Sequence, residues 1–257
     1  MKTSGNTILI TGGGSGIGAA LAQRFHDRGD TVIVAGRRAD ALAQAIEGRE
    51  RMHAITLDVD SAEGVVDFAK RLLAEYPEVN VLINNAGIMR LEDIDTARDL
   101  TSAEETINTN ILGPIRLIDA LVDHLKTQPD AAIVNVTSGL AFVPMTAGAV
   151  YSATKAAMHS YTVSLRSALK GQVEVIELAP PAVQTGLTPG QENRPGYQPL
   201  DEFADEVLAL FNQQPTPPEI LVERVKFLRN AEAEGRYDAT VEQLNAFAKQ
   251  ARESQPA

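Results

Sequence analysis

The feature that most constrains the fold is a regular alternation of short apolar runs with longer segments of helical periodicity. Short runs rich in Val, Ile and Leu are typical of strands buried on both faces of a parallel sheet. The candidate strands are Thr7–Thr11, Thr31–Ala35, His53–Leu57, Val79–Asn84, Ala131–Thr137 and Val173–Leu178. The segments with helical periodicity are Gly16–Arg28, Ala39–Glu47, Ala62–Glu75, Arg98–Lys126 and Val150–Lys170. This order predicts one α/β domain over residues 1–257, a Rossmann-type doubly wound parallel sheet with helices on both faces.

The last third of the chain is less regular. Residues 186–200 are rich in Gly, Pro and polar residues, which predicts a mobile loop that contributes to a substrate pocket. We expect a helix over Asp201–Phe211, a short edge strand over Glu219–Val222, and a charged helical tail over 231–257.

Composition excludes several classes of function. The net charge of −11 disfavours nucleic-acid and anionic-membrane partners, and the absence of Cys excludes thiolate catalysis and disulfides. The four His are scattered over predicted elements, so we expect no metal site. The first apolar run is too short for a signal peptide, and no later stretch is long enough to span a bilayer, which predicts a cytoplasmic protein.

A glycine-rich turn follows the first predicted strand, in the sequence Thr11-Gly-Gly-Gly-Ser-Gly-Ile-Gly18. Such a turn lets the backbone approach a pyrophosphate at the N-terminus of the next helix. Glycines alone can simply close a loop, but a position at a strand–helix junction favours a dinucleotide site.

Gly36-Arg37-Arg38 follows the second predicted strand, where NAD sites usually carry an acidic residue for the ribose hydroxyl. A guanidinium binds the 2′-phosphate of NADP through parallel hydrogen bonds. Unless both arginines are ordinary surface residues, this pattern predicts a preference for NADP(H) over NAD(H).

A candidate reaction centre is spread over three segments. Tyr151 and Lys155 lie four apart on one helix, Ser138 ends the fifth predicted strand, and Asn110 lies within a long helix. A charge about 4 Å from the phenol contributes roughly 4 kcal/mol at an effective dielectric of about 20. We therefore expect Lys155 to lower the pKa of Tyr151 from about 10 to near 7.

With these residues the chain resembles the short-chain dehydrogenase/reductase family from about residue 5 to about residue 188. The further matching pieces are Asp58-Val59, Asn84 to Gly87, and Pro180 to Thr185. The resemblance implies that Tyr151 donates the proton in reduction and Ser138 orients the carbonyl. It also implies that Asn110 positions a water and that Lys155 holds the nicotinamide ribose. The full expected cofactor set is Gly12, Ser15, Gly16, Ile17, Gly18, Arg37, Arg38, Asp58, Val59, Asn85, Ala86, Gly87, Tyr151, Lys155, Pro180, Val183 and Thr185.

Two further features refine the resemblance. The sequence has Pro180-Pro181 where the family usually has Pro-Gly, which predicts a stiffer loop on the nicotinamide side. The stretches 178–185 and 219–229 resemble a bacterial subgroup of small oxidoreductases linked to teichoic-acid alanylation.

The expected substrate pocket is mostly apolar, with Met89, Leu140, Phe142 and Met145 beside the catalytic residues. This predicts an oxidoreductase that reversibly reduces an uncharged, partly hydrophobic ketone or aldehyde. Two alternatives remain open: a non-catalytic NADP-binding sensor, and an epimerase or dehydratase with tightly bound nicotinamide. Since the family is usually dimeric or tetrameric, we expect a homodimer or homotetramer formed through the helices over 98–126 and 150–170.

Overall fold

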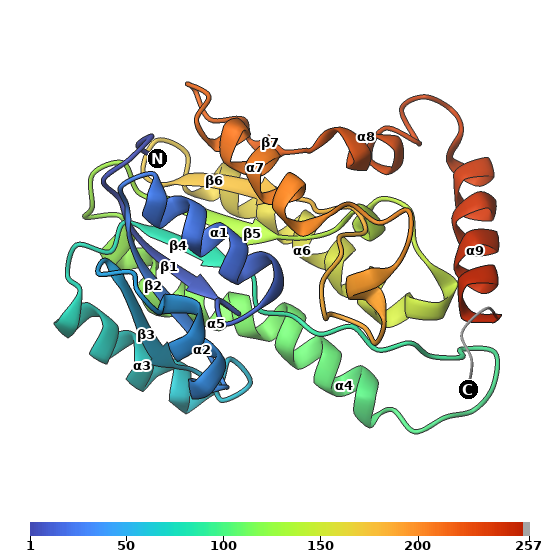
Figure 1. Ribbon diagram of the computed structural model, residues 1–257, viewed down its shortest axis with the longest axis horizontal. Coiled ribbons are helices and arrows are strands. Elements are labelled where there is room, and N and C mark those ends of the chain that lie inside the picture. The colour runs from blue at the N-terminus through green and yellow to red at the C-terminus, as the bar shows by residue number, and fades with distance from the viewer. Residues whose placement is uncertain (254–257) are drawn as a thin grey trace.

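Seven parallel strands form the centre of the molecule, in the order β3-β2-β1-β4-β5-β6-β7 (Figure 1). The computed structural model describes residues 1–253. The strands are β1 (Thr7–Thr11), β2 (Thr31–Gly36), β3 (Met52–Thr56), β4 (Val81–Asn84), β5 (Ala132–Val136), β6 (Glu174–Leu178) and β7 (Glu219–Ile220). The strand order reverses between β1 and β4, and ligands of such sheets bind where this reversal leaves a crevice.

Helices cover both faces of this sheet, as the alternation of strands and helices predicts. They are α1 (Gly16–Asp27), α2 (Ala39–Ile46), α3 (Ala62–Glu75), α4 (Thr101–Ile107), α5 (Gly113–Leu125), α6 (Ala149–Ala168), α7 (Leu200–Phe211), α8 (Glu223–Arg229) and α9 (Tyr237–Glu253). The doubly wound α/β fold is confirmed.

Two apolar cores lie against the two faces because successive side chains of a strand point in opposite directions. Ile8 and Ile10 of β1 enter the core shared with α1 and α7, where the rings of Phe25 and Phe211 meet edge to face at 5.6 Å. Leu9, between them, enters the other core, which α3, α5 and the end of α6 cover. Figure 1 shows α1 and α7 side by side on one face.

The helix predicted over Arg98–Lys126 is helical without a break over Thr101–Leu125, but it is not a single α-helix. The structure has α4, then a π-helical turn over Asn108–Leu112, then α5, and residues 98–100 precede the first helical residue. Helical periodicity alone does not distinguish a π turn, because one inserted residue barely disturbs the apolar pattern.

The C-terminal third also departs from expectation. The predicted edge strand contains only Glu219–Ile220, α8 was not predicted, and the tail helix begins at Tyr237 rather than at residue 231. Residues 186–200 include a short 3-10 turn over Gln191–Asn193 and are anchored by the Val183–Gln198 bridge. Among residues 1–253, every helix is too short or too polar to cross a bilayer.

Candidate active site

The glycine turn places the start of α1 against the end of β4. Gly12 has a φ of +66°, and a Cβ there would lie 2.9 Å from Asn85 Nδ2. At Gly18 a Cβ would lie 2.4 Å from the carbonyl oxygen of Gly12, so no larger residue fits. Asn85 Nδ2 donates to the Thr11 carbonyl at 2.9 Å, which ties β4 to the turn. Asn85 therefore braces the turn.

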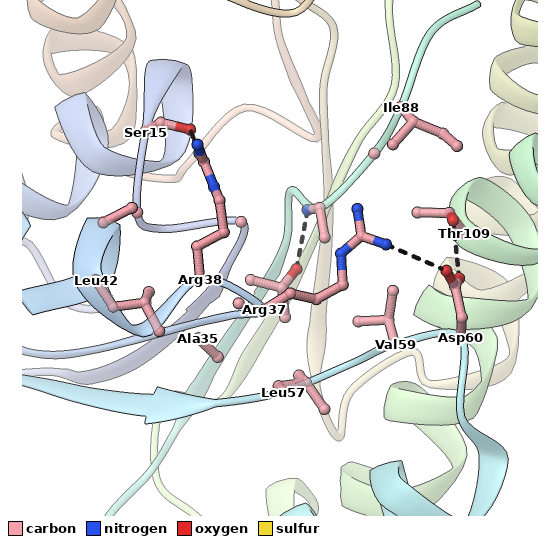
Figure 2. Close-up of a pocket in the computed structure, with 17 residues that line it drawn as sticks. Ser15, Ala35, Arg37, Arg38, Leu42, Leu57, Val59, Asp60, Ile88 and Thr109 are labelled. Atoms are coloured by element: carbon pink, nitrogen blue, oxygen red, sulfur yellow. Dashed lines mark hydrogen bonds and ion pairs between the residues drawn. The ribbon is translucent and has the colours of Figure 1, made fainter.

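A cavity opens beside this turn, at the carboxyl ends of β1, β2 and β4 (Figure 2). Its apolar lining suits a flat ring, and its glycine backbone and arginines suit phosphates. The expected cofactor residues that line it are Gly12, Ser15, Arg37, Arg38, Val59, Ala86 and Gly87. The other lining residues are Thr11, Gly14, Ala35, Gly36, Ala41, Leu42, Leu57, Asp60, Ile88 and Thr109.

The two arginines diverge across this cavity. Arg38 donates to Ser15 Oγ at 3.1 Å, whereas an Arg37 nitrogen lies 3.9 Å from a carboxylate oxygen of Asp60 (Figure 2). The Arg37 side chain is 61% exposed. Arg38 therefore lies toward the glycine turn and Arg37 toward the opposite wall.

Asp60 lines the cavity, whereas Asp58, an expected cofactor residue, does not. Asp58 is exposed and is absent from the cavity lining, and its carboxylate accepts the backbone N–H of Asp60 at 3.1 Å. Asp60 accepts from the Thr109 hydroxyl at 2.8 Å. Asp60 and Thr109 were missed, because their position beside the cavity depends on the π turn that carries Thr109.

The segment after β6 reaches the other side of the glycine turn. A Cβ on Gly16 would lie 3.5 Å from Cβ of Thr185, so these two distant parts of the chain meet as expected. Gln191 Nε2 donates to the Val183 carbonyl at 2.8 Å and to Thr185 Oγ1 at 3.2 Å. These bonds anchor the loop that the sequence predicts to be mobile. The Pro180 carbonyl accepts from Gly139 N at 2.8 Å, which places it beside Ser138.

Asn110 lies in the π turn and is 2% exposed. Its Oδ1 accepts from Ile88 N at 2.9 Å, and its Nδ2 donates to the Ile88 carbonyl at 2.9 Å and to Thr154 Oγ1 at 3.2 Å. Both amide hydrogens are therefore used, and a water could only donate to the second lone pair of Oδ1. Thr154, which the sequence reading missed, also donates to the Tyr151 carbonyl at 2.7 Å.

Ser138, Tyr151 and Lys155 come together as predicted, and all three are less than 9% exposed. Ser138 lies two residues beyond the end of β5, at the start of a 3-10 turn, whereas the other two lie on the first turns of α6. The Tyr151 hydroxyl forms a hydrogen bond with Ser138. Ser138 Oγ also accepts from Leu140 N at 3.1 Å, and because its bond to Tyr151 lowers the pKa of the phenol, its one hydroxyl hydrogen points to Tyr151 and would have to turn to a substrate oxygen.

The expected pKa of Tyr151 near 7 is wrong for this structure. Burial raises the pKa of Tyr151 to about 12, and the hydrogen bond with Ser138 acts in the opposite direction. Burial also lowers the pKa of Lys155 to about 8. Lys155 Nζ donates to the Val136 carbonyl at 2.8 Å and lies 5.5 Å from the centre of the Tyr151 ring. Desolvation disfavours both charged forms, and it outweighs the attraction that the sequence argument considered alone.

The expected substrate-pocket residues fall into two groups. A Cβ on Gly148, just before α6, would lie 2.9 Å from Met89 Cε and 3.2 Å from Met145 Cε, so the two methionines meet beside the catalytic helix. Leu140 is half-buried in the turn after Ser138. Phe142 packs differently: its ring lies 5.0 Å from the His159 ring and 4.8 Å from the Arg229 guanidinium. Phe142 thus contributes to packing between α6 and α8.

Comparison with known proteins supplies the family. The profile of the short chain dehydrogenase family matches residues 6–195 of this chain. The chain belongs to the short-chain dehydrogenase/reductase family. It is 40% identical to the uncharacterized oxidoreductase DltE of Bacillus subtilis (strain 168) over 252 residues, which are 95% of this chain and 98% of DltE. This match confirms the predicted relation to the teichoic-acid subgroup.

Two further short-chain dehydrogenase/reductase proteins are informative. Sulfoacetaldehyde reductase 2 of Chromohalobacter salexigens is 35% identical over 186 residues, 70% of this chain and 74% of that protein. The structure of a short chain dehydrogenase from Burkholderia cenocepacia J2315 in complex with NADP has a TM-score of 0.80 and 26% identity. It covers 95% of this chain and 99% of that one. The chain is therefore an NAD(P)-dependent oxidoreductase of this family. The glycine turn and the apolar cavity beside it fit a nicotinamide dinucleotide.

One cluster outside these sites has the spacing of metal ligands. The ligand atoms of His159, Glu177 and Glu219 all lie within 4.8 Å of one another. From the sequence we expected no metal site at any of the four His, and neither carboxylate was singled out. The three residues come from α6, β6 and β7, so only the tertiary structure brings them together.

Proposed function

We propose that this protein is an NADPH-dependent carbonyl reductase that reversibly reduces an uncharged, partly hydrophobic ketone or aldehyde to an alcohol. The observation that carries this proposal is the buried Ser138–Tyr151 hydrogen bond beside a phenol that remains protonated at neutral pH. A protonated phenol can donate to the oxygen of a carbonyl as negative charge develops on it.

The chain's own residues have separate tasks in this proposal. The cofactor supplies the hydride when it is bound. Ser138 donates a hydrogen bond to the substrate oxygen, and Tyr151 gives that oxygen its proton. The ammonium of Lys155 holds ribose hydroxyls. Its positive charge also offsets the negative charge that Tyr151 carries once it has given up its proton. Asn110 fixes the Ile88 segment against α6 and accepts from a relay water only at Oδ1.

The substrate class follows from the surroundings of α6. Met89 and Met145 present flexible apolar ends next to Gly148, which favours a small apolar group beside the carbonyl. The nearby cavity against α9 is lined by three carboxylates, on Glu92, Asp93 and Asp95, and by the ammonium of Lys249, and Glu92 also pairs with Arg98. The apolar methionine ends, and not the charge of this cavity, therefore support a neutral substrate.

NADP(H) is the proposed preferred cofactor because Arg37 and Arg38 flank the cavity end and Gly36 offers no carboxylate to a ribose hydroxyl. Arg38, the second of the two expected arginines, donates to Ser15 Oγ in the glycine turn. A 2′-phosphate between the two guanidinium groups would receive hydrogen bonds from both sides.

A homodimer or homotetramer is the proposed assembly. Ile107, Leu112 and Val163 are more than 40% exposed on or between α4, α5 and α6. An apolar set of this kind on the outer helices is consistent with a subunit contact. Light scattering at micromolar concentration tests the assembly, and a monomer mass would contradict it.

The test of the function is a panel of ketones and aldehydes followed by the loss of NADPH absorbance. We expect neutral substrates to turn over with one NADPH consumed per product formed. Turnover without net NADPH consumption would instead indicate an epimerase or dehydratase. No turnover of any carbonyl, with NADPH still bound, would contradict the proposal.

A further inference from the structure

Glu177 is a carboxylate on β6, the strand between β5 and the edge strand β7, and it has no solvent exposure. A buried charge is tolerated only when partners replace the lost water. Thr137 Oγ1 donates to one Glu177 oxygen at 2.6 Å, and the other oxygen lies 2.8 Å from His159 Nδ1. Since the carboxylate can only accept, the Nδ1 atom carries the hydrogen in this contact.

A second ion pair closes the cluster. Arg229 of α8 donates to both oxygens of Glu219, at 3.0 and 3.1 Å. The guanidinium group also lies over the Phe142 ring, whose other neighbour is His159. Each of His159, Glu177 and Glu219 therefore already has a protein partner, and Arg229 supplies the positive charge that a metal ion would supply. We interpret the cluster as a closed network of ion pairs and hydrogen bonds.

This network holds the backbone on both sides of Ser138. Thr137, the residue before it, donates its N–H to the Leu178 carbonyl at 2.8 Å and its hydroxyl to Glu177. Gly139, the residue after it, packs against α8, because a Cβ there would lie 2.8 Å from Leu228 Cδ1. The contacts from α8 and β7 come from beyond residue 195, where the family profile ends.

We propose that Glu177 is a positioning residue for Ser138, acting through the Thr137 hydroxyl. This inference rests on the proposed role of Ser138. The charged carboxylate fixes the Thr137 side chain and with it the end of β5, so that Ser138 Oγ stays within reach of Tyr151 and the substrate oxygen. Arg229 and Glu219 complete the arrangement by holding the Ser138–Phe142 turn from the other side. The network thereby connects the C-terminal segment to the reaction centre.

The test compares Thr137→Val with Thr137→Ser, because valine keeps the shape of threonine and removes the hydroxyl, whereas serine keeps the hydroxyl. A charge-assisted hydrogen bond of this kind contributes enough to change a rate about tenfold or more. We expect Thr137→Val and Glu177→Gln to lower kcat by about that factor while KM for NADPH stays within about twofold. Thr137→Ser should restore most of kcat. Glu174→Gln, a half-buried carboxylate on the same strand, is the matched control and should leave kcat unchanged.

A double-mutant cycle separates positioning from general stability. If Glu177 acts through Ser138, adding Thr137→Val to Ser138→Ala should cause no further loss of kcat. An equal loss in both backgrounds would overturn the inference, as would wild-type kcat in Thr137→Val. If residual activity in Ser138→Ala is too low to measure, the comparison of the valine and serine variants decides alone. Wild-type kcat in Ser138→Ala would instead contradict the proposed function itself.

Discussion

Tyr151, Lys155 and Ser138 are 5 to 8% exposed, whereas the Arg37 side chain at the other end of the same crevice is 61% exposed. At the buried end, desolvation raises the pKa of Tyr151 to about 12 and lowers the pKa of Lys155 to about 8. At the exposed end, water and salt screen the charges of Arg37, Arg38 and Asp60. A single substitution at the buried end, where we place the chemistry, should therefore have a large effect on activity. At the exposed end, where we place cofactor selection, each contact is weaker and the effects should add.

The largest effect should come from removing the phenol oxygen. We expect Tyr151→Phe to lower kcat by about a thousandfold or more, because general acid catalysis contributes roughly 10²–10⁴-fold. NADPH binding, measured by fluorescence titration, should change little. Tyr161→Phe, half-buried on the same helix, is the control. Activity of Tyr151→Phe within tenfold of wild type would remove Tyr151 from the mechanism.

Lys155→Ala should affect both chemistry and binding. Two interactions of the buried ammonium are lost, one with the cofactor ribose and one with Tyr151, and each contributes roughly 1.5–3 kcal/mol. We therefore expect kcat/KM to fall by about a hundredfold. The dissociation constant for NADPH should rise by about tenfold or more. An unchanged dissociation constant would show that Lys155 does not hold the cofactor.

The pH dependence of activity should report the ionisation of Tyr151 and Lys155 at the buried end. Tyr151, with a pKa raised to about 12, stays protonated from pH 6 to 9, so it should not limit reduction in that range. Lys155, with a pKa lowered to about 8, is charged below that pH and loses its proton above it. We therefore expect kcat/KM for reduction to be flat below about pH 8 and to decline above it. Alcohol oxidation should accelerate with pH up to about pH 8, because the ionised fraction of Tyr151 rises, and should level off above it as Lys155 loses its charge. Reduction that accelerates between pH 7 and 9 would contradict these roles.

Effects at the exposed end should be smaller and sensitive to salt. We expect Arg37→Ala and Arg38→Ala each to lower kcat/KM for NADPH by about tenfold, the lower end of the range for a charge-assisted hydrogen bond. The value for NADH should change little, and Gly36→Asp should shift preference toward NADH. Arg71→Ala, an exposed arginine paired with Glu75 on α3, is the control. A wild-type enzyme that uses both cofactors equally would contradict the assignment.

The smallest effect is expected at Asp60. Its carboxylate lies 3.9 Å from Arg37 and competes with a 2′-phosphate for that guanidinium. Exposed ion pairs contribute roughly 0.2–1 kcal/mol, so Asp60→Asn should improve the KM for NADPH about twofold to fivefold. The KM for NADH should stay constant in the same assay. A weaker affinity for NADPH would mean that Asp60 orients Arg37 for binding instead of competing for it.

The parts of the fold that were predicted correctly are those with a strong local signal. The apolar runs identify six of the seven strands, because a strand that is buried on both faces has apolar residues at consecutive positions. The glycine turn, Ser138 and the Tyr151–Lys155 pair were likewise recognisable from residue type and spacing. Helix α8 has too few residues for a periodicity to be visible, and the edge strand expected over Glu219–Val222 contains only Glu219–Ile220.

The sequence by itself determined the strand–helix order, the place of the glycine turn and the identity of the residues proposed for the reaction. The tertiary structure decided which carboxylate lines the cavity, how Asn110 is held by a π turn, and in which direction burial moves the pKa of Tyr151. It also decided that Glu177 meets Thr137 and His159, which are 40 and 18 residues away along the chain. The physical reason is that hydrogen bonding and desolvation depend on every group that packs around an atom, and those groups come from distant parts of the chain.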